Sequence, residues 1–226
     1  MITIAIDGAS GVGKSTLSDA LAARLGILHL DTGEMYRAVG LCVLENGIDP
    51  QDEQAVSAFV RGGACAVTVR YVDGKQHTLL QGRNVSPALH DEAIGLAASA
   101  VSRYAAVRAF LVERQQAIAR DMPLVMDGRD IGTVVLPDAP LKFFLTAAPE
   151  TRARRRCRQL HLNADSPEGQ AVLSRLLARD RQDSERAQSP LRAAPDAVIL
   201  STDALSFKET LDEMLNHVRK IDPVAR

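Results

Sequence analysis

A glycine-rich turn near the N-terminus constrains this chain more than any other stretch of its sequence. The turn follows the pattern G-x-x-x-x-G-K-[ST], which is matched by Gly8, Gly13, Lys14 and Ser15. Residues 3–7 before it are mostly apolar, and residues 15–25 after it carry a leucine at every fourth position. A strand, a loop and a helix are therefore predicted, which is the context in which this pattern binds phosphate.

The chemistry of this turn depends on its backbone. Main-chain N–H groups and the positive end of the following helix surround a phosphate chain, and glycines allow the backbone to approach it closely. We expect Lys14 to reach the β- and γ-phosphate oxygens and the Ser15 hydroxyl to bind Mg²⁺. The alternative is a chance match in an ordinary strand–helix turn, and the flanking strand and helix patterns argue against it.

Composition limits the classes of partner. The 226 residues suffice for one α/β domain with a full core and a small insert. Lys and Arg number 27 against 28 Asp and Glu, a net charge of -1 that argues against a general binder of nucleic acid or membrane surfaces. Three widely spaced cysteines predict free thiols. With no signal-peptide pattern and no long apolar run, the expected compartment is the cytoplasm.

Apolar runs alternate with helical patterns along the chain, which predicts a parallel sheet of about five strands with right-handed crossovers. The strands are expected at residues 3–7, 27–30, 123–126, 141–145 and 197–200. The helices are expected at residues 15–25, 34–45, 54–60, 87–102 and 105–121, from 149, up to 186 and from 206. Alternating residues on both sides of Asp73-Gly74 predict a hairpin, and therefore a small antiparallel sheet inserted in the parallel domain.

Polar residues follow two of the predicted buried strands. Asp31-Thr32-Gly33 follows one strand, and Asp127-Gly128-Arg129-Asp130 follows another. Because ligands of open α/β sheets bind at the carboxyl ends of the strands, both segments are candidates for a site. Arg37 lies in the helix after the first segment, where the alternative is a solvated surface charge.

Two later helices are rich in charge. The first carries Arg152, Arg154, Arg155, Arg156 and Arg158, which either form a solvated face or belong to a mobile lid that binds ATP phosphates. A polar break at residues 163–169 would let such a lid turn. In the second helix Arg179, Asp183 and Arg186 share one face by their spacing, although intrahelical ion pairs would also explain that pattern.

These motifs together resemble the bacterial cytidylate kinase family. The resemblance rests on Asp7-Gly8, on residues 30–39, on residues 127–135, on Pro137-Asp138-Ala139-Pro140 and on the triplet in the second charged helix. It implies a nucleoside monophosphate kinase fold of the P-loop type, in a single domain over residues 1–226. It also implies a nucleotide-binding insert at about residues 54–104 and a short arginine-rich lid at about residues 152–170.

The resemblance further implies the substrates and their sites. The reaction would be phosphoryl transfer from ATP, with Mg²⁺, to CMP or dCMP by a monomer. The residues placed on ATP are Gly8, Ala9, Ser10, Gly11, Val12, Gly13, Lys14, Ser15 and Thr16. Those placed on CMP are Thr32, Tyr36, Arg37, Ser99, Arg108, Arg129, Asp130, Arg179, Asp183 and Arg186. The catalytic set would be Lys14, Arg37, Arg129 and Arg186.

Within the second set, the resemblance assigns individual roles. Thr32, Arg37, Arg129, Arg179 and Arg186 would bind the acceptor phosphate. Ser99, Arg108 and Asp130 would read cytosine, and Asp183 would bind the pentose. The chain departs from the family pattern at Ala9, at Leu89-His90 and at Ala105.

Two other readings of the same residues stay open on the sequence alone. In the first, the chain phosphorylates a small hydroxylated metabolite, and Asp31 acts as the general base. This reading leaves the arginines without a second phosphate to bind. In the second, the chain is a nucleotide-dependent switch with slow hydrolysis and a protein partner.

Overall fold

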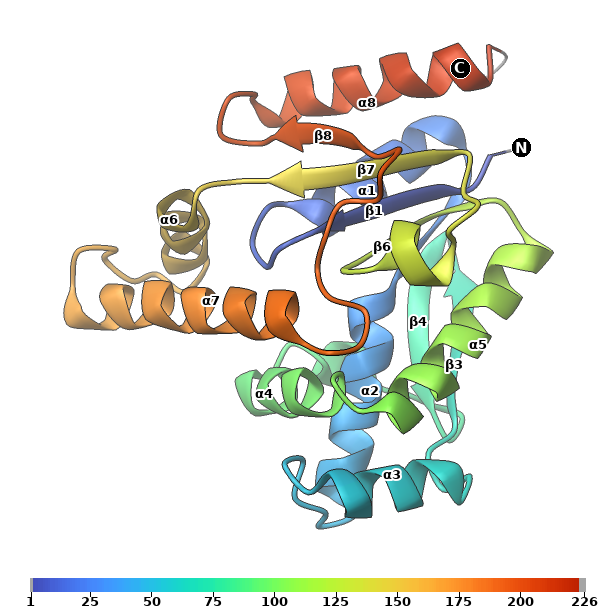
Figure 1. Cartoon of the computed structure of the whole chain (residues 1–226), viewed down its shortest axis with the longest axis vertical. Coiled ribbons are helices and arrows are strands. Elements are labelled where there is room, and N and C mark those ends of the chain that lie inside the picture. The colour runs from blue at the N-terminus through green and yellow to red at the C-terminus, as the bar shows by residue number, and fades with distance from the viewer. Residues whose placement is uncertain (1, 224–226) are drawn as a thin grey trace. The chain divides into compact units, whose positions relative to one another are not determined.

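The computed structural model describes residues 2–223 and contains two sheets (Figure 1). A five-stranded sheet has the order β2-β6-β1-β7-β8, and a three-stranded sheet has the order β3-β4-β5. In the larger sheet β1 pairs in parallel with β6 and β7, and β7 pairs in parallel with β8. The predicted fold class is therefore confirmed.

The chain forms two compact units: the first is made of the residues before 28 and after 122, and the second of residues 28–122. The first unit contains β1 (Ile4–Gly8), α1 (Lys14–Leu25), β6 (Leu124–Gly128), η2 (Ile131–Val135), β7 (Leu141–Thr146), α6 (Pro149–Gln159), α7 (Pro167–Glu185), β8 (Val198–Ser201) and α8 (Phe207–Ile221). The second unit contains β2 (Leu28–Asp31), α2 (Thr32–Glu45), α3 (Glu53–Arg61), β3 (Val67–Val72), β4 (Lys75–Leu80), β5 (Arg83–Asn84), η1 (Ser86–Ala88), α4 (Glu92–Val101) and α5 (Ala105–Asp121).

The core of the first unit is aliphatic and lies between the central strands and two helices. Ile4, Ile6 and Phe143 on β1 and β7 are almost completely buried, and they cluster with Leu21 of α1 and Met214 of α8. Near-continuous apolar runs are typical of strands buried on both faces. In the β1–β6 pair Asp7 lies opposite Gly128, so the loops after these two strands leave the sheet at the same edge.

Helices α6 and α7 lie side by side (Figure 1), and a smaller apolar cluster joins them. It is made by Ala153 and Cys157 of α6 and by Val172 and Leu176 of α7. The two arginine-rich helices of the sequence therefore pack on each other through their apolar faces, which leaves their polar faces for other contacts.

Several helix boundaries differ from the predicted ones, and capping explains two of these differences. The predicted helix at 87–102 is broken, because Asp91 accepts from the main-chain N–H groups of Ala93 and Ile94 and starts α4 at Glu92. The Asp31 side chain caps α2 in the same way, so that helix starts at Thr32. Helix α7 ends at Glu185, so Arg186 lies just beyond the helix and not on its face.

The small antiparallel sheet is joined to the first turn of α2 by side chains. Glu34 accepts hydrogen bonds from Thr78 Oγ1 at 2.7 Å and from Ser86 Oγ at 3.1 Å. The Gln76 amide accepts from the main-chain N–H of Asp31 at 2.8 Å and donates to its carbonyl at 3.1 Å, as a neighbouring strand would. The sheet is therefore anchored to the start of α2. The boundaries of the predicted insert and lid stay predictions.

Among the described residues, no single helix has the length and apolar character needed to cross a membrane. Only α4 and α5 taken together, with a bend of 101° between them, meet that criterion of length and composition.

Candidate active site

The glycine-rich turn forms the predicted loop between β1 and α1. A side chain at Gly8 would place its Cβ 2.4 Å from the carbonyl oxygen of Leu145, so the strand end admits only glycine. Gly11 and Gly13 have positive φ angles of 79° and 95°. Lys14 is buried, and its Nζ donates to the carbonyl oxygen of Ala9 at 2.8 Å. An ammonium group has three donors, so this bond is compatible with phosphate contacts as well.

A carboxylate that the sequence did not assign lies next to the loop. The Ser15 hydroxyl is 3.3 Å from Oδ2 of Asp127, which is buried at the end of β6. A hydroxyl and a carboxylate are the hard oxygen ligands that Mg²⁺ prefers, and this ion commonly takes only one or two protein oxygens beside phosphate. The pair therefore fits the ion expected with ATP. Asp127 lies at the end of a predicted buried strand, and this position is the sequence signal that could have identified it.

Four of the predicted acceptor residues form two ion pairs in the first unit. Arg129 Nε lies 3.0 Å from Asp183 Oδ2, and Arg186 Nη2 lies 3.7 Å from Asp130 Oδ1. The side chains of Asp130, Asp183 and Arg186 are each at most 7% exposed. Both arginines are therefore held by carboxylates from other segments of the chain.

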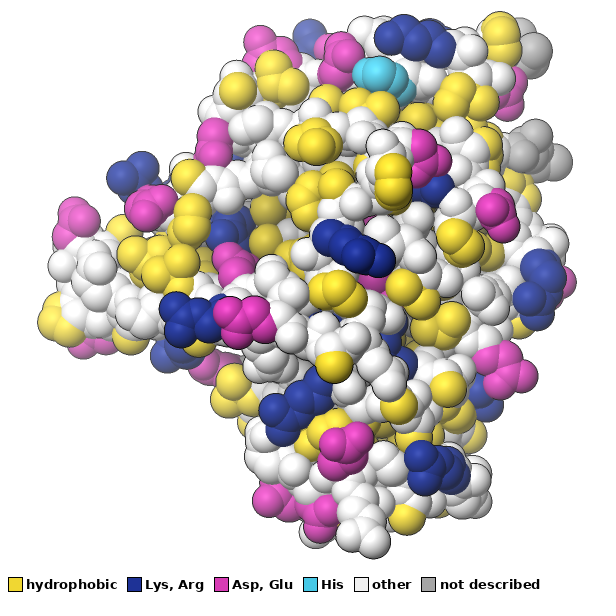
Figure 2. Space-filling view, viewed as in Figure 1, with side chains coloured by type: hydrophobic (Ala, Val, Ile, Leu, Met, Phe, Trp, Pro, Cys, Tyr) yellow, Lys and Arg dark blue, Asp and Glu magenta, His cyan; other side chains and the backbone are white. Residues whose placement is uncertain are grey.

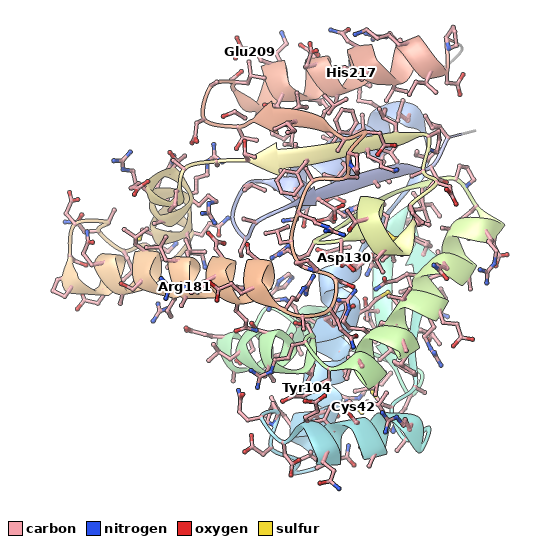
Figure 3. The ribbon with its side chains drawn as sticks, viewed as in Figure 1. Cys42, Tyr104, Asp130, Arg181, Glu209 and His217 are labelled. Carbon is pink, nitrogen blue, oxygen red and sulfur yellow. The ribbon has the colours of Figure 1, made fainter. Side chains whose placement is uncertain are left out.

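The remaining member of this group, Arg179, lies one turn before Asp183 on α7 and is half-buried. By contrast Arg181, labelled with Asp130 in Figure 3, is exposed. On α7, Arg179 and Asp183 thus lie on a less exposed face than Arg181. The spacing of Arg179 and Asp183 in the sequence predicted that they share one face of the helix.

Asp7 positions the segment that carries Arg129 and Asp130. Its carboxylate accepts from the main-chain N–H groups of Ile131 at 2.7 Å and of Gly132 at 2.8 Å, in the π-helical turn η2. Burial raises the pKa of Asp7 from 3.8 to about 6, although these two donors act in the opposite direction. The sequence indicated neither the π-helical turn nor its partner, because they meet only through the pairing of β1 with β6.

The second unit holds the other predicted acceptor residues. Arg108 of α5 is buried and donates from Nη1 to the Tyr36 hydroxyl at 3.2 Å. Arg37 Nη1 donates to the carbonyl oxygen of Leu89 at 2.9 Å. Thr32 is buried as the first residue of α2, and Ser99 is half-buried on α4.

Two glycines let α2 and α4 approach closely around these residues. A Cβ at Gly40 would lie 2.8 Å from the main-chain nitrogen of Ala98, and a Cβ at Gly95 would lie 3.0 Å from Arg37 Nη1. The Arg37 guanidinium therefore rests over Gly95 and is fixed there by the Leu89 carbonyl. Each unit on its own thus brings part of the predicted set together.

Comparison with known proteins identifies a family. The family model described as "Cytidylate kinase" matches residues 4–220. A protein named "Cytidylate kinase" from Caldicellulosiruptor bescii is 42% identical over 220 residues, covering 97% of this chain and 96% of that protein. One of the same name from Mycobacterium avium is 45% identical over 226 residues, covering 100% and 98%.

A solved structure of an uncharacterized protein from Eubacterium ventriosum has a similar fold. It superposes with a TM-score of 0.54 at 13% identity, covering 97% of this chain and 98% of that one. At this identity the likeness concerns the fold alone.

The raised pKa of Asp7 predicts a pH-dependent difference between the wild type and Asp7→Asn. Because the folded pKa exceeds the unfolded one, the stabilising effect of the protonated carboxyl is complete below about pH 4 and is lost as pH rises through about 6. Asparagine does not titrate. Urea unfolding between about pH 4 and 7 should show the wild type losing up to roughly 3 kcal/mol relative to the variant. A difference that is independent of pH would contradict this prediction.

Proposed function

The chain belongs to the cytidylate kinase family, and we propose that it transfers the γ-phosphoryl group of ATP to CMP or dCMP, giving ADP and CDP or dCDP. The observation that carries this proposal is the family match over residues 4–220, supported by relatives that the chain covers almost completely. The enzyme is accordingly a transferase of pyrimidine nucleotide metabolism.

The acceptor phosphate is proposed to bind arginines. A guanidinium group can hold two phosphate oxygens at once, which fixes the line of attack and offsets negative charge. Arg37, Arg129 and Arg186 are each held by an oxygen of the protein, which supports a role as preorganised donors. The attacking phosphate oxygen is already ionised, so the reaction needs no general base. Thr32 and Arg179 are proposed to complete the phosphate contacts.

ATP is proposed to bind the loop from Gly8 to Thr16. The N–H groups of the loop and the ammonium group of Lys14 would bind the phosphate chain, at the positive end of α1. Ser15 and Asp127 would hold Mg²⁺, which supplies positive charge at the β- and γ-phosphate oxygens when it is bound. These contacts would fix the position of the γ-phosphorus. The rate acceleration would then come from positioning of the reactants and from electrostatic stabilisation.

Selection of the base follows from the hydrogen-bonding edge of cytosine. The N4 amino group is a donor beside the N3 and O2 acceptors, so a carboxylate and donors from Ser or Arg match it. We assign Asp130 to N4, Ser99 and Arg108 to the acceptors, and Asp183 to the pentose. The contact from Arg108 to the Tyr36 hydroxyl supports an oriented guanidinium.

One departure from the family pattern has a physical reading. Arg37 donates to the main-chain carbonyl of Leu89, so this contact does not use the side chain of residue 89. The change to Leu89-His90 is therefore compatible with the proposed role of Arg37.

We also propose that the enzyme acts as a monomer in the cytoplasm, without a nucleic-acid or membrane partner. The net charge of -1 argues against a nucleic-acid or membrane partner, as does the mixture of basic and acidic side chains on the face shown in Figure 2. Closure of the insert and of the lid at residues 152–170 around the substrates stays part of the proposal, because closure would exclude water from the reacting phosphate.

An acceptor panel tests the proposed function. With ATP and Mg²⁺ in a coupled ADP-release assay, CMP and dCMP should be phosphorylated, whereas sugars and other hydroxylated metabolites should not. Activity on a hydroxylated metabolite alone would favour the reading in which Asp31 is a base. ATP hydrolysis that CMP does not accelerate would favour a nucleotide-dependent switch.

Asp130→Asn should narrow the preference for CMP over UMP. With the carboxylate present, the O4 atom of uracil would face another acceptor in a desolvated pocket, which costs roughly 1–3 kcal/mol, or about ten- to a hundredfold in preference. The kcat/KM ratio of the two acceptors measures this. The exposed Asp138→Asn is the matched control and should keep the wild-type ratio. An unchanged ratio in Asp130→Asn would remove this residue from base recognition.

A further inference from the structure

Two carbonyl groups of the phosphate loop accept hydrogen bonds from side chains outside the loop. For its N–H groups to face an anion, the carbonyls of the same peptides must face elsewhere, and a buried carbonyl needs a donor. The Ser10 carbonyl accepts from Arg152 Nη1 at 3.1 Å, and the Val12 carbonyl accepts from Thr202 Oγ1 at 3.1 Å. With the bond from Lys14 to Ala9, three carbonyls of the loop have side-chain donors.

Arg152 reaches the loop from α6 and is held in place there. Its side chain is 3% exposed, and it donates from Nε to the Ala147 carbonyl at 3.1 Å. The two terminal nitrogens bind the Asp180 carboxylate of α7 at 3.0 and 2.5 Å. A Cβ at Gly11 would lie 3.3 Å from Cβ of Arg152, so the stem of this arginine packs on the loop itself.

The contact to Val12 is supported by a second arginine of α6. Arg155 donates to Oγ1 of Thr202 at 2.9 Å and to its carbonyl at 2.7 Å. Thr146 O already accepts from the main-chain N–H of Thr202 at 2.9 Å. The hydroxyl has a single proton, and its shorter contact is to the Val12 carbonyl, which is 3.1 Å away against 3.3 Å for Thr146 O. The hydrogen bonds from Arg155 to Thr202 and from Thr202 to Val12 thus form a relay that links α6 to the loop.

We propose that Arg152, Arg155 and Thr202 are positioning residues that fix the phosphate loop in its anion-binding conformation, and that Asp180 holds Arg152 in that role. The proposal rests on the proposed function, since it takes ATP as the ligand of the loop. It assigns these two arginines a role different from the lid hypothesis, in which the arginines of α6 bind ATP phosphates directly.

Asp180→Asn separates the two roles. If Asp180 positions Arg152, the variant holds the Ser10 carbonyl less firmly, and the Kd for ATP with Mg²⁺, measured by calorimetry, should rise about tenfold. The KM for CMP at saturating ATP should change less than about threefold, a split that general destabilisation would not produce. If Arg152 binds ATP directly, release from Asp180 should leave the affinity unchanged or increase it, which would overturn the proposal. Arg175→Lys, exposed on the same helix, is the control.

A pair of substitutions at Thr202 provides an independent test if Asp180→Asn does not fold. Thr202→Val keeps the shape and removes the hydroxyl donor, so it should weaken ATP binding about tenfold. Thr202→Ser restores the donor and should bind ATP within about threefold of the wild type. Equal ATP affinity in the Val and Ser variants would contradict the relay. Because the readout is ATP binding, a wild type inactive on CMP would refute the proposed function and leave this test valid.

Discussion

Coulomb repulsion between two phosphate groups is the constraint on which the proposed site depends. Two unit charges about 4 Å apart repel by about 4 kcal/mol at the effective dielectric of a partly buried site. A chain with a net charge of -1 has no overall positive field to offset this, so the offset must be local. We propose that the arginines of the acceptor set and the lysine of the phosphate loop provide it. Carboxylates or main-chain carbonyls hold Arg37, Arg129, Arg186 and Lys14 in place.

The same constraint acts on the backbone. Peptide N–H groups bind an anion only while their carbonyls are bonded elsewhere, and the loop meets this condition with donors from Lys14, Arg152 and Thr202. Asp7 does the converse at the end of β1, where its carboxylate accepts from the main-chain N–H groups of Ile131 and Gly132, just after Arg129 and Asp130. Charged and polar side chains thus fix the main chain around the candidate site.

Local sequence signals were sufficient for most of the fold. Apolar runs and the Asp73-Gly74 hairpin predicted strands and a turn that the structure contains. The site was harder to predict where partners come from distant segments. Asp127 beside Ser15 and Asp180 beside Arg152 are joined by strand order and helix packing, which no local pattern encodes. Likewise, the sequence could not separate arginines that support the loop from exposed ones on the same helix.

The most direct measurement is the rate of CMP phosphorylation by Arg129→Ala at saturating ATP and CMP. By analogy with other arginines that stabilise phosphoryl transfer, turnover should fall on the order of 10³-fold or more, while the affinity for ATP should stay near the wild-type value. Phosphorylation of CMP at the full wild-type rate would contradict the claim that fixed guanidinium groups offset the repulsion between the two phosphate groups.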